Sequence, residues 1–220
     1  VRRRRKQNQR QQSRMSHDGD GDLSCDSEKC RVILEDGTEF VLYKSELSRY
    51  GICQGEALVP ENLQKILEEV LPLRARKYAM NLLLKKDRTE KELTEKLRRA
   101  GYPAQAAQNA VDYVKSFGYI DDERYAAHFL EMGSGKESLK SLSWKLAGKG
   151  VSQEIIEKVK ETFQESIDSE EVIRNLVERR LGGRKLTDEK SLRNMAAYLG
   201  RRGFSGEEIW HVLKKYRQEE

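Results

Sequence analysis

Residues 93–102 read LTEKLRRAGY, and this stretch decides the fold because its pattern returns twice further along the chain. Leu93 and Leu97 lie four positions apart, which places them on one face of a helix. Gly101 follows as a helix stop, because glycine reaches the left-handed conformation that closes a helix without steric cost. The sequence therefore predicts three copies of one helical unit. The later copies follow at intervals of about fifty residues and contain Leu142, Leu146 and Gly150, then Met195, Leu199 and Gly203.

Two more helices complete each expected unit. One begins directly after the glycine, at Pro103, Ser152 or Ser205, because proline suits the first turn of a helix and serine can cap it. The apolar stripes of these helices are Ala107, Val111 and Val114; Ile156, Val159 and Phe163; and Ile209, Leu213 and Tyr216. The other helix comes before the repeated stretch and is marked by Tyr78, Leu82 and Leu83; by Tyr125, Phe129 and Leu130; and by Val172, Ile173, Leu176 and Val177.

The segment before the repeats has a different pattern. Residues 31–35 and 39–43 are rich in Val, Ile, Leu and Phe and flank Asp36-Gly37. This dipeptide predicts a two-residue hairpin turn of type I′, which needs positive φ at both positions. An isolated hairpin is marginal in water, so we expect it to pack on a neighbouring helix.

A helix is expected over residues 61–70. It should end at Leu71, because the ring of Pro72 disfavours the helical conformation in the residue before it. Residues 1–24 contain almost no apolar side chains and are expected to be disordered.

The expected fold class is mainly α, an elongated tandem array of three three-helix repeats behind a small β-hairpin plus helix segment. A bundle of about fifty residues buries little of its own surface, so neighbouring repeats should pack on one another. The expected divisions are a disordered basic tail (1–24), the hairpin and helix extension (25–74) and the three repeats (75–120, 121–167 and 168–220).

Composition limits the class of protein. Mean hydropathy is −0.83 and 36% of the residues are charged, and no apolar run approaches the ~20 residues needed to span a bilayer. The chain also shows no apolar stretch typical of a signal peptide. We therefore expect a cytoplasmic monomer without membrane contact, whose Cys25, Cys30 and Cys53 are reduced thiols.

The net charge of +5 is unevenly distributed. Residues 1–14 carry seven basic side chains and no acidic ones, whereas residues 15–74 carry six basic and thirteen acidic ones. Residues 75–120 carry ten basic and five acidic side chains, so the first repeat is the folded part best suited to contact phosphates. A solvated helix surface is the alternative, because acidic residues are interleaved with the basic ones.

No motif typical of an active site is complete in this sequence. Residues 133–136 read GSGK, but Glu137 stands where a phosphate-binding loop needs Ser or Thr. The histidines are single residues without a neighbouring nucleophile or a ligand spacing. We therefore expect no enzyme activity, no cofactor and no metal site.

At three stretches the chain resembles the RecX family of regulatory proteins. These stretches are residues 79–84, residues 89–102 and residues 117–126, the last of which reads FGYIDDERYA. Residues 145–146 and 149–151 also fit the pattern of the second repeat in this family. The resemblance covers residues 75–220 and is strongest over 75–126. It implies a regulator of the RecA recombinase, all-helical and without catalytic residues. Such a protein would lie in the groove of the RecA filament on single-stranded DNA and block strand exchange and coprotease activity, or promote filament disassembly.

The charge distribution and the resemblance together give the candidate residues. The acidic motif after the first repeat is expected to be structural, because aspartate at a helix start interacts favourably with the helix dipole. Its members are Asp121, Asp122, Arg124 and Tyr125. The candidate contacts to RecA or DNA are Lys85, Lys86, Arg88, Lys96, Arg98, Arg99, Lys145, Lys149, Arg201 and Arg202.

Two other functions stay open. The segment 93–115 is similar to a helix-turn-helix, which would suit a sequence-tolerant DNA-binding repeat protein acting without RecA. A structural adaptor for a different protein partner is the other alternative.

Overall fold

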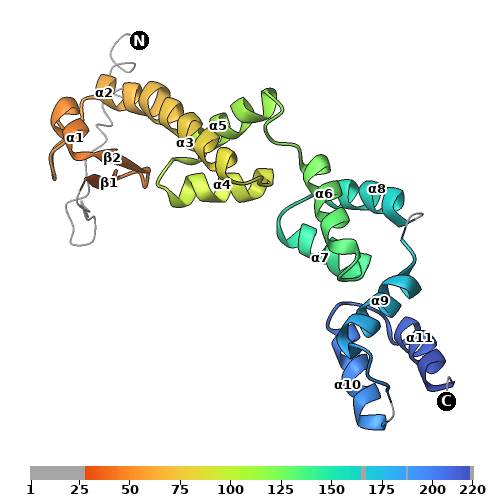
Figure 1. Ribbon diagram of the computed structural model, residues 1–220. Coiled ribbons are helices and arrows are strands. Elements are labelled where there is room, and N and C mark those ends of the chain that lie inside the picture. The colour runs from red at the N-terminus through yellow and green to blue at the C-terminus, as the bar shows by residue number, and fades with distance from the viewer. Residues whose placement is uncertain (1–27, 165–166, 187, 219–220) are drawn as a thin grey trace, which may run out of the picture. The chain divides into compact units, whose positions relative to one another are not determined.

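The computed structural model describes residues 28–164, 167–186 and 188–218 (Figure 1). The tail predicted at 1–24 therefore lies outside the described residues. The chain divides into two compact units. Among the described residues, the first unit contains 28–88 and 92–120, and the second contains 89–91 and the residues from Asp121 onward.

The predicted hairpin is confirmed, but its turn is different. Strands β1 (Lys29–Ile33) and β2 (Glu39–Tyr43) pair antiparallel, and alternate residues of each strand are buried. Gly37 donates to the carbonyl of Leu34, and Leu34 donates to the carbonyl of Thr38, both at 2.9 Å. These bonds close a longer loop in which Gly37 has φ of 80°, whereas no described non-glycine residue has positive φ. The type I′ prediction was therefore wrong at Asp36, since a glycine at one position satisfies the longer loop.

Cysteine pairing also differs from the prediction. Cys30 is completely buried in β1 and is disulfide-bonded, so the expectation of reduced thiols was wrong at this position. Cys53 is free and exposed, as expected.

A continuous helical segment follows α1 (Lys44–Tyr50). It consists of α2 (Pro60–Lys65), a π-helical turn η1 (Ile66–Val70) and α3 (Leu71–Lys85). The predicted helix end at Leu71 was wrong, because the backbone stays helical through Val70 and Leu71. Leu71 donates to the carbonyl of Ile66, five residues back, and this wider turn accommodates a proline that cannot donate a helical bond.

The hairpin packs against this helical segment in the first unit. Phe40 and Leu42 of β2 share one core with Ile66 and Leu71. The first repeat follows, with α3, α4 (Glu90–Arg99) and α5 (Ala104–Ser116). Its buried residues confirm the predicted stripes of α4 and α5: Leu93, Leu97, Ala107, Val111 and Val114.

The stripe predicted for α3 was only partly right. Leu82 and Leu83 are partly buried, but Tyr78 is 37% exposed. Ala75 and Ala79 are fully buried in the same core instead. Small side chains let α3 and α5 approach closely, so α3 turns its alanines toward the core.

The second unit contains two three-helix groups (Figure 1). The second repeat consists of α6 (Asp122–Ser134), α7 (Leu139–Gly148) and α8 (Gln153–Gln164). The third repeat consists of α9 (Ser169–Leu181), α10 (Glu189–Gly200) and α11 (Gly206–Gln218). The predicted pairs are buried in each core: Leu142 and Leu146 in one, Met195 and Leu199 in the other.

The three predicted helix stops are confirmed. Gly101, Gly150 and Gly203 have φ of 85°, 88° and 88°. The following helices begin as expected, because Ser152 Oγ accepts the N–H of Ile155 at 3.3 Å and Ser205 and Glu208 cap each other's backbone.

Each of these glycine turns also bonds to an earlier segment of its own unit. The carbonyl of Gly101 accepts the N–H of Val41 in β2 at 3.1 Å. In the second unit, the carbonyl of Lys149 accepts the Thr89 hydroxyl at 2.7 Å, and the carbonyl of Arg202 accepts the N–H of Ser138 at 2.9 Å. Thr89 and Ser138 directly precede α4 and α7. The residue before each of these helices therefore bonds to the carbonyl that precedes a glycine stop, through its hydroxyl at Thr89 and its backbone N–H at Ser138. The hairpin takes the corresponding place for the first repeat.

Candidate interaction surface

Most of the candidate contacts in the first unit are exposed basic side chains. Lys85 ends α3, Lys86 and Arg88 lie in the following link, and Lys96, Arg98 and Arg99 belong to α4. Four of these side chains are exposed, whereas Arg88 and Lys96 are half-buried. Arg99 pairs with Glu95 at 3.1 Å, and no other member of the group has an ion pair with a described acid. The group therefore presents positive charge that its described neighbours leave largely uncompensated.

Arg98 lies beside a groove of about 410 Å³ between the hairpin turn and the start of α5. Thr38 and Glu39 line one side of this groove, and Tyr102 and Pro103 the other. Burial raises the pKa of Tyr102 to about 12, although the nearby Arg74 opposes this shift. The Tyr102 phenol is therefore neutral at physiological pH and does not act as a base.

Lys145 and Lys149 both contact other side chains of the second repeat. The Lys145 ammonium bonds to the Glu137 carboxylate. Burial alone would raise the pKa of Glu137, but hydrogen bonds from Lys145 and Ser141 outweigh it and lower that pKa. Lys149 Nζ lies 5.7 Å from the ring centre of Tyr125 and close to the Phe129 ring. Both lysines therefore have partners within their own repeat.

Arg201 and Arg202 differ in their surroundings. Arg201 is exposed after α10. Arg202 is half-buried, with its guanidinium carbon 3.8 Å from the centre of the Tyr198 ring and Arg180 4.1 Å from the same ring. Arg202 also uses its carbonyl to hold Ser138, so its contacts are those of a packing residue.

The acidic motif at the start of α6 caps two helices. The Asp121 carboxylate accepts the N–H of Arg124 at 2.9 Å, which caps α6 itself. The Asp122 carboxylate accepts the N–H of Glu90 at 3.0 Å, at the first residue of α4. The Tyr125 ring stacks near Phe129, with their centres 6.3 Å apart. Sequence reasoning did not foresee the cap on α4, because its partner lies 32 positions away.

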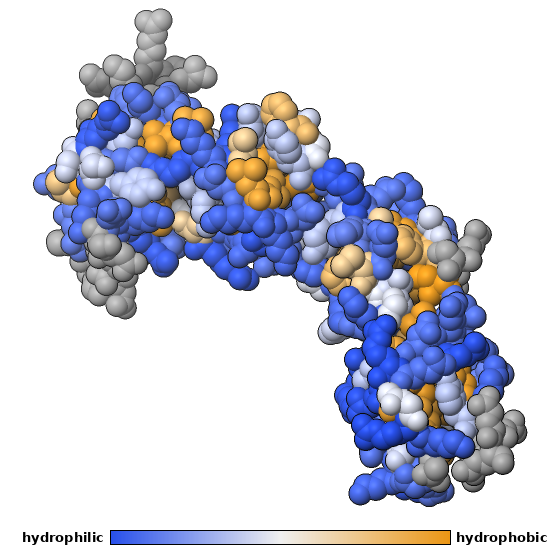
Figure 2. Space-filling model, viewed as in Figure 1, coloured by the Kyte–Doolittle hydropathy of each residue, from blue (hydrophilic) through white to orange (hydrophobic). Residues whose placement is uncertain are grey.

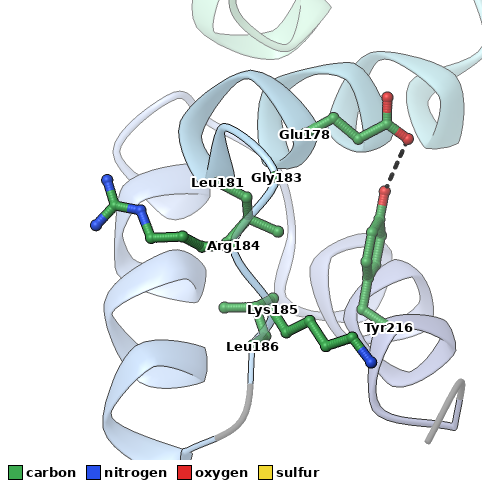
Figure 3. Close-up of a pocket in the computed structure, with 7 residues that line it drawn as sticks. All are labelled: Glu178, Leu181, Gly183, Arg184, Lys185, Leu186 and Tyr216. Carbon is green, nitrogen blue, oxygen red and sulfur yellow. Dashed lines mark hydrogen bonds between the residues drawn. The ribbon is translucent and has the colours of Figure 1, made fainter.

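A pocket of about 410 Å³ lies in the third repeat, between the end of α9 and α11 (Figure 3). The Tyr216 hydroxyl bonds to the Glu178 carboxylate at 3.2 Å on one side. Lys185 extends toward Tyr216, whereas Arg184 points away from it. The two cations do not converge, so this pocket offers a single ammonium group to a ligand.

Several large aromatic side chains are exposed, and sequence reasoning assigned none of them a role. Phe117 and Tyr119 follow α5 in the first unit, at 58% and 52% exposed. Trp144 on α7 and Trp210 on α11 are exposed as well. The signal in the sequence is that Phe117 and Tyr119 flank Gly118, beyond the last buried position of the α5 stripe.

Within the described ranges, none of the helices combines the length and apolar character that a bilayer crossing requires. The described side chains also contain no group of three or more His, Cys, Asp or Glu residues placed to hold a metal ion.

Two parts of the chain match family descriptions. Residues 75–113 match "RecX, first three-helix domain", and residues 168–213 match "RecX, third three-helix domain". These matches cover most of α3 to α5 and of α9 to α11.

Individual relatives extend the similarity over most of the chain. "Regulatory protein RecX" of Caldanaerobacter subterraneus subsp. tengcongensis is 31% identical over 188 residues, which cover 85% of this chain and 93% of the relative. The protein of the same name from Xanthomonas oryzae pv. oryzae is 35% identical over 152 residues, covering 64% of this chain and 93% of the relative.

Solved structures show the same fold at lower identity. A crystal structure of regulatory protein RecX covers 92% of this chain and 98% of its own, with a TM-score of 0.57 and 17% identity. RecX from Lactobacillus salivarius covers 67% of this chain and 97% of its own, with a TM-score of 0.55 and 17% identity.

Proposed function

Because this chain belongs to the RecX family, we propose that it regulates RecA by binding the RecA filament on single-stranded DNA. Binding inhibits or modulates the recombinase, ATPase and coprotease activities of RecA in DNA repair and the SOS response. The protein acts in the cytoplasm as a monomer and has no catalytic residues of its own.

The observation that carries this proposal is the basic group of the first unit. Five of its six members have no ion pair with a described acid, although acidic residues are interleaved with them in the sequence. A solvated helix surface would be expected to pair these charges along the helix. Uncompensated positive charge instead suits a partner that carries phosphates or acidic side chains.

Repetition supports the same proposal. A filament offers the same surface many times, and repeats joined in one chain can each make a weak contact. The second contact then becomes intramolecular, which raises the overall affinity without a single strong site. Lys145, Lys149 and Arg202 already have partners within the second unit. Binding through several weak contacts does not need these three residues, because no single patch must supply all the binding energy.

The test is RecA-promoted strand exchange with this protein titrated below the RecA concentration. We expect inhibition by the wild type, and about tenfold weaker inhibition by the variant Arg98→Glu plus Arg99→Glu, because the basic group would then repel its partner. Arg184→Glu plus Lys185→Glu is the matched control, with the same charge change at adjacent exposed positions of the third repeat. Circular dichroism establishes that each variant is folded.

The two possible failures are distinct. If the folded Arg98 and Arg99 variant inhibits as well as the wild type, the basic group is not the contact surface. If the wild type leaves strand exchange, ATPase and coprotease activity unchanged, RecA regulation itself is wrong.

DNA binding without RecA is the second candidate function, and the same uncompensated charge favours it. Sequence-specific reading is not supported, because the polar side chains of α5 bond to one another. Gln105 donates to Asn109 at 3.1 Å and Gln108 donates to Asp112 at 2.9 Å. Binding would therefore be tolerant of sequence, and its affinity should fall with salt by a log–log slope of about −0.7 per phosphate neutralised on single strands.

A further inference from the structure

Three aromatic rings form a ladder where α5 ends in the first unit. The Tyr113 and Phe117 rings lie 5.0 Å apart at 60°, and the Phe117 and Tyr119 rings lie 6.0 Å apart at 22°. The guanidinium of Arg76 on α3 lies 4.8 Å from the centre of the Tyr113 ring. Figure 2 shows hydrophobic side chains gathered over this part of the first unit, around α5 and the neighbouring α3.

The backbone holds the rings of Phe117 and Tyr119 in place. Gly118, with φ of 70°, donates to the carbonyl of Lys115 at 2.9 Å, and Tyr119 donates to the carbonyl of Val114 at 3.0 Å. This pair of bonds is the Schellman motif, which closes a helix at a glycine. Ile120 is then only 5% exposed and anchors the chain in the core of the repeat. Phe117 and Tyr119 are therefore exposed on an ordered turn.

Large exposed rings on an ordered turn are costly to leave in water, so they indicate a partner. The charge of the surrounding repeat indicates which kind. Residues 75–120 carry ten basic and five acidic side chains, which attracts a polyanion. A positively charged surface that carries stacking aromatics is the combination by which proteins hold single-stranded nucleic acid, because every base offers a π-face.

We propose that Phe117 and Tyr119 form a stacking platform for the bases of single-stranded DNA, with Tyr113 and Arg76 supporting it from beneath. This rests on the proposed function and makes it more specific, because it assigns a direct contact to DNA. The rings are near-parallel and already close together, so a base stacks on an outer face and does not enter between them. Contact through ring faces is independent of base identity.

The test measures fluorescence anisotropy of a labelled oligothymidine with the full chain, in the absence of RecA. We expect Phe117→Ala plus Tyr119→Ala to weaken binding about tenfold, the order expected from losing base stacking. Leu73→Ala is the matched control, since Leu73 is 56% exposed in the same unit but has no ring. Its binding should be unchanged. Phe117→Leu plus Tyr119→Leu keeps apolar area but removes the π-faces. It should therefore bind as weakly as the alanine variant.

A strand of the same length without bases separates stacking from charge. The wild type should bind this abasic strand about tenfold more weakly than oligothymidine, whereas the double alanine variant should bind both alike. Equal discrimination by the two proteins overturns the proposal. Unchanged oligothymidine binding together with abolished inhibition of RecA also overturns it, because the rings are then a protein contact, and RecA regulation still stands.

Discussion

Gly101, Gly150 and Gly203 each meet two requirements at once. Their positive φ ends a helix, a conformation that other residues adopt only with strain. A side chain at each would also collide with an earlier segment of the same unit: with Val41 at Gly101, with Lys91 at Gly150 and with Ser138 and Ser141 at Gly203. The helix stop and the close contact with an earlier segment of the unit therefore depend on the same residue.

We predict that Gly203→Ala destabilises the second unit more than Gly183→Ala does. Both glycines have similar φ, 88° and 86°, so backbone strain of about 1–3 kcal/mol is common to both. A Cβ at Gly203 would lie 2.6 Å from Ser138 Oγ and from Ser141 Cβ, whereas one at Gly183 meets nothing within 4 Å. Overpacking adds about 1–3 kcal/mol. Urea denaturation compares the free energies of unfolding of the two variants. Equal destabilisation would show that the close contact of Gly203 with Ser138 and Ser141 does not contribute.

At the scale of elements, the hairpin is held on α3 by one arginine as well as by apolar packing. Arg74 bonds to the Glu46 carboxylate of α1, and its guanidinium lies 4.7 Å from the Tyr43 ring of β2. It also donates to the carbonyl of Val41 at 3.4 Å. Arg74 therefore joins three elements of the first unit, and both charged side chains of the pair are about one-fifth exposed or less.

Arg74→Met should lower the free energy of unfolding of the first unit by about 2 kcal/mol, because it leaves the Glu46 carboxylate partly buried without its cation. Adding Glu46→Gln should recover part of this stability, since no unpaired charge then remains. Lys77→Met, at an exposed position of the same helix, is the control and should change stability little. Chemical denaturation gives the free energy of unfolding of the wild type and of the three variants. A double variant no more stable than Arg74→Met would argue against the charge pair.

At the scale of the whole molecule, basic charge is concentrated in two stretches of the sequence. One is the first repeat, residues 75–120, and the other is residues 1–14, with seven basic side chains and no acidic ones. These fourteen residues precede the part that the structure describes. Their composition suits nonspecific attraction to phosphates, because clustered lysine and arginine release counterions from DNA without reading bases.

Deleting residues 1–14 should therefore weaken nonspecific DNA binding and reduce its dependence on salt. The log–log slope should become shallower by about 0.7 for each phosphate of a single strand that the tail neutralises in the full chain. Inhibition of RecA should be retained, because the basic group of the first unit stays intact. Oligonucleotide titrations at several salt concentrations, with strand exchange in parallel, test both parts. A truncated protein that no longer inhibits RecA would show that the tail takes part in regulation.

The sequence alone determined the repeats, their glycine stops and most of their buried stripes. These features are local, because helix periodicity and positive φ depend on residues a few positions apart. Tertiary structure decided the rest. The burial of Ala75 and Ala79 and the cap of Asp122 on α4 depend on residues distant in the chain. The π-turn before Pro72 is a local feature, but a proline in the sequence favours a helix end there, so it was not predicted. Contacts with distant residues also occupy Lys149, whose ammonium lies over the Tyr125 ring, and the carbonyl of Arg202, which accepts the N–H of Ser138. Phe117 and Tyr119 stay exposed, so the tertiary structure decided which candidates are accessible to a partner.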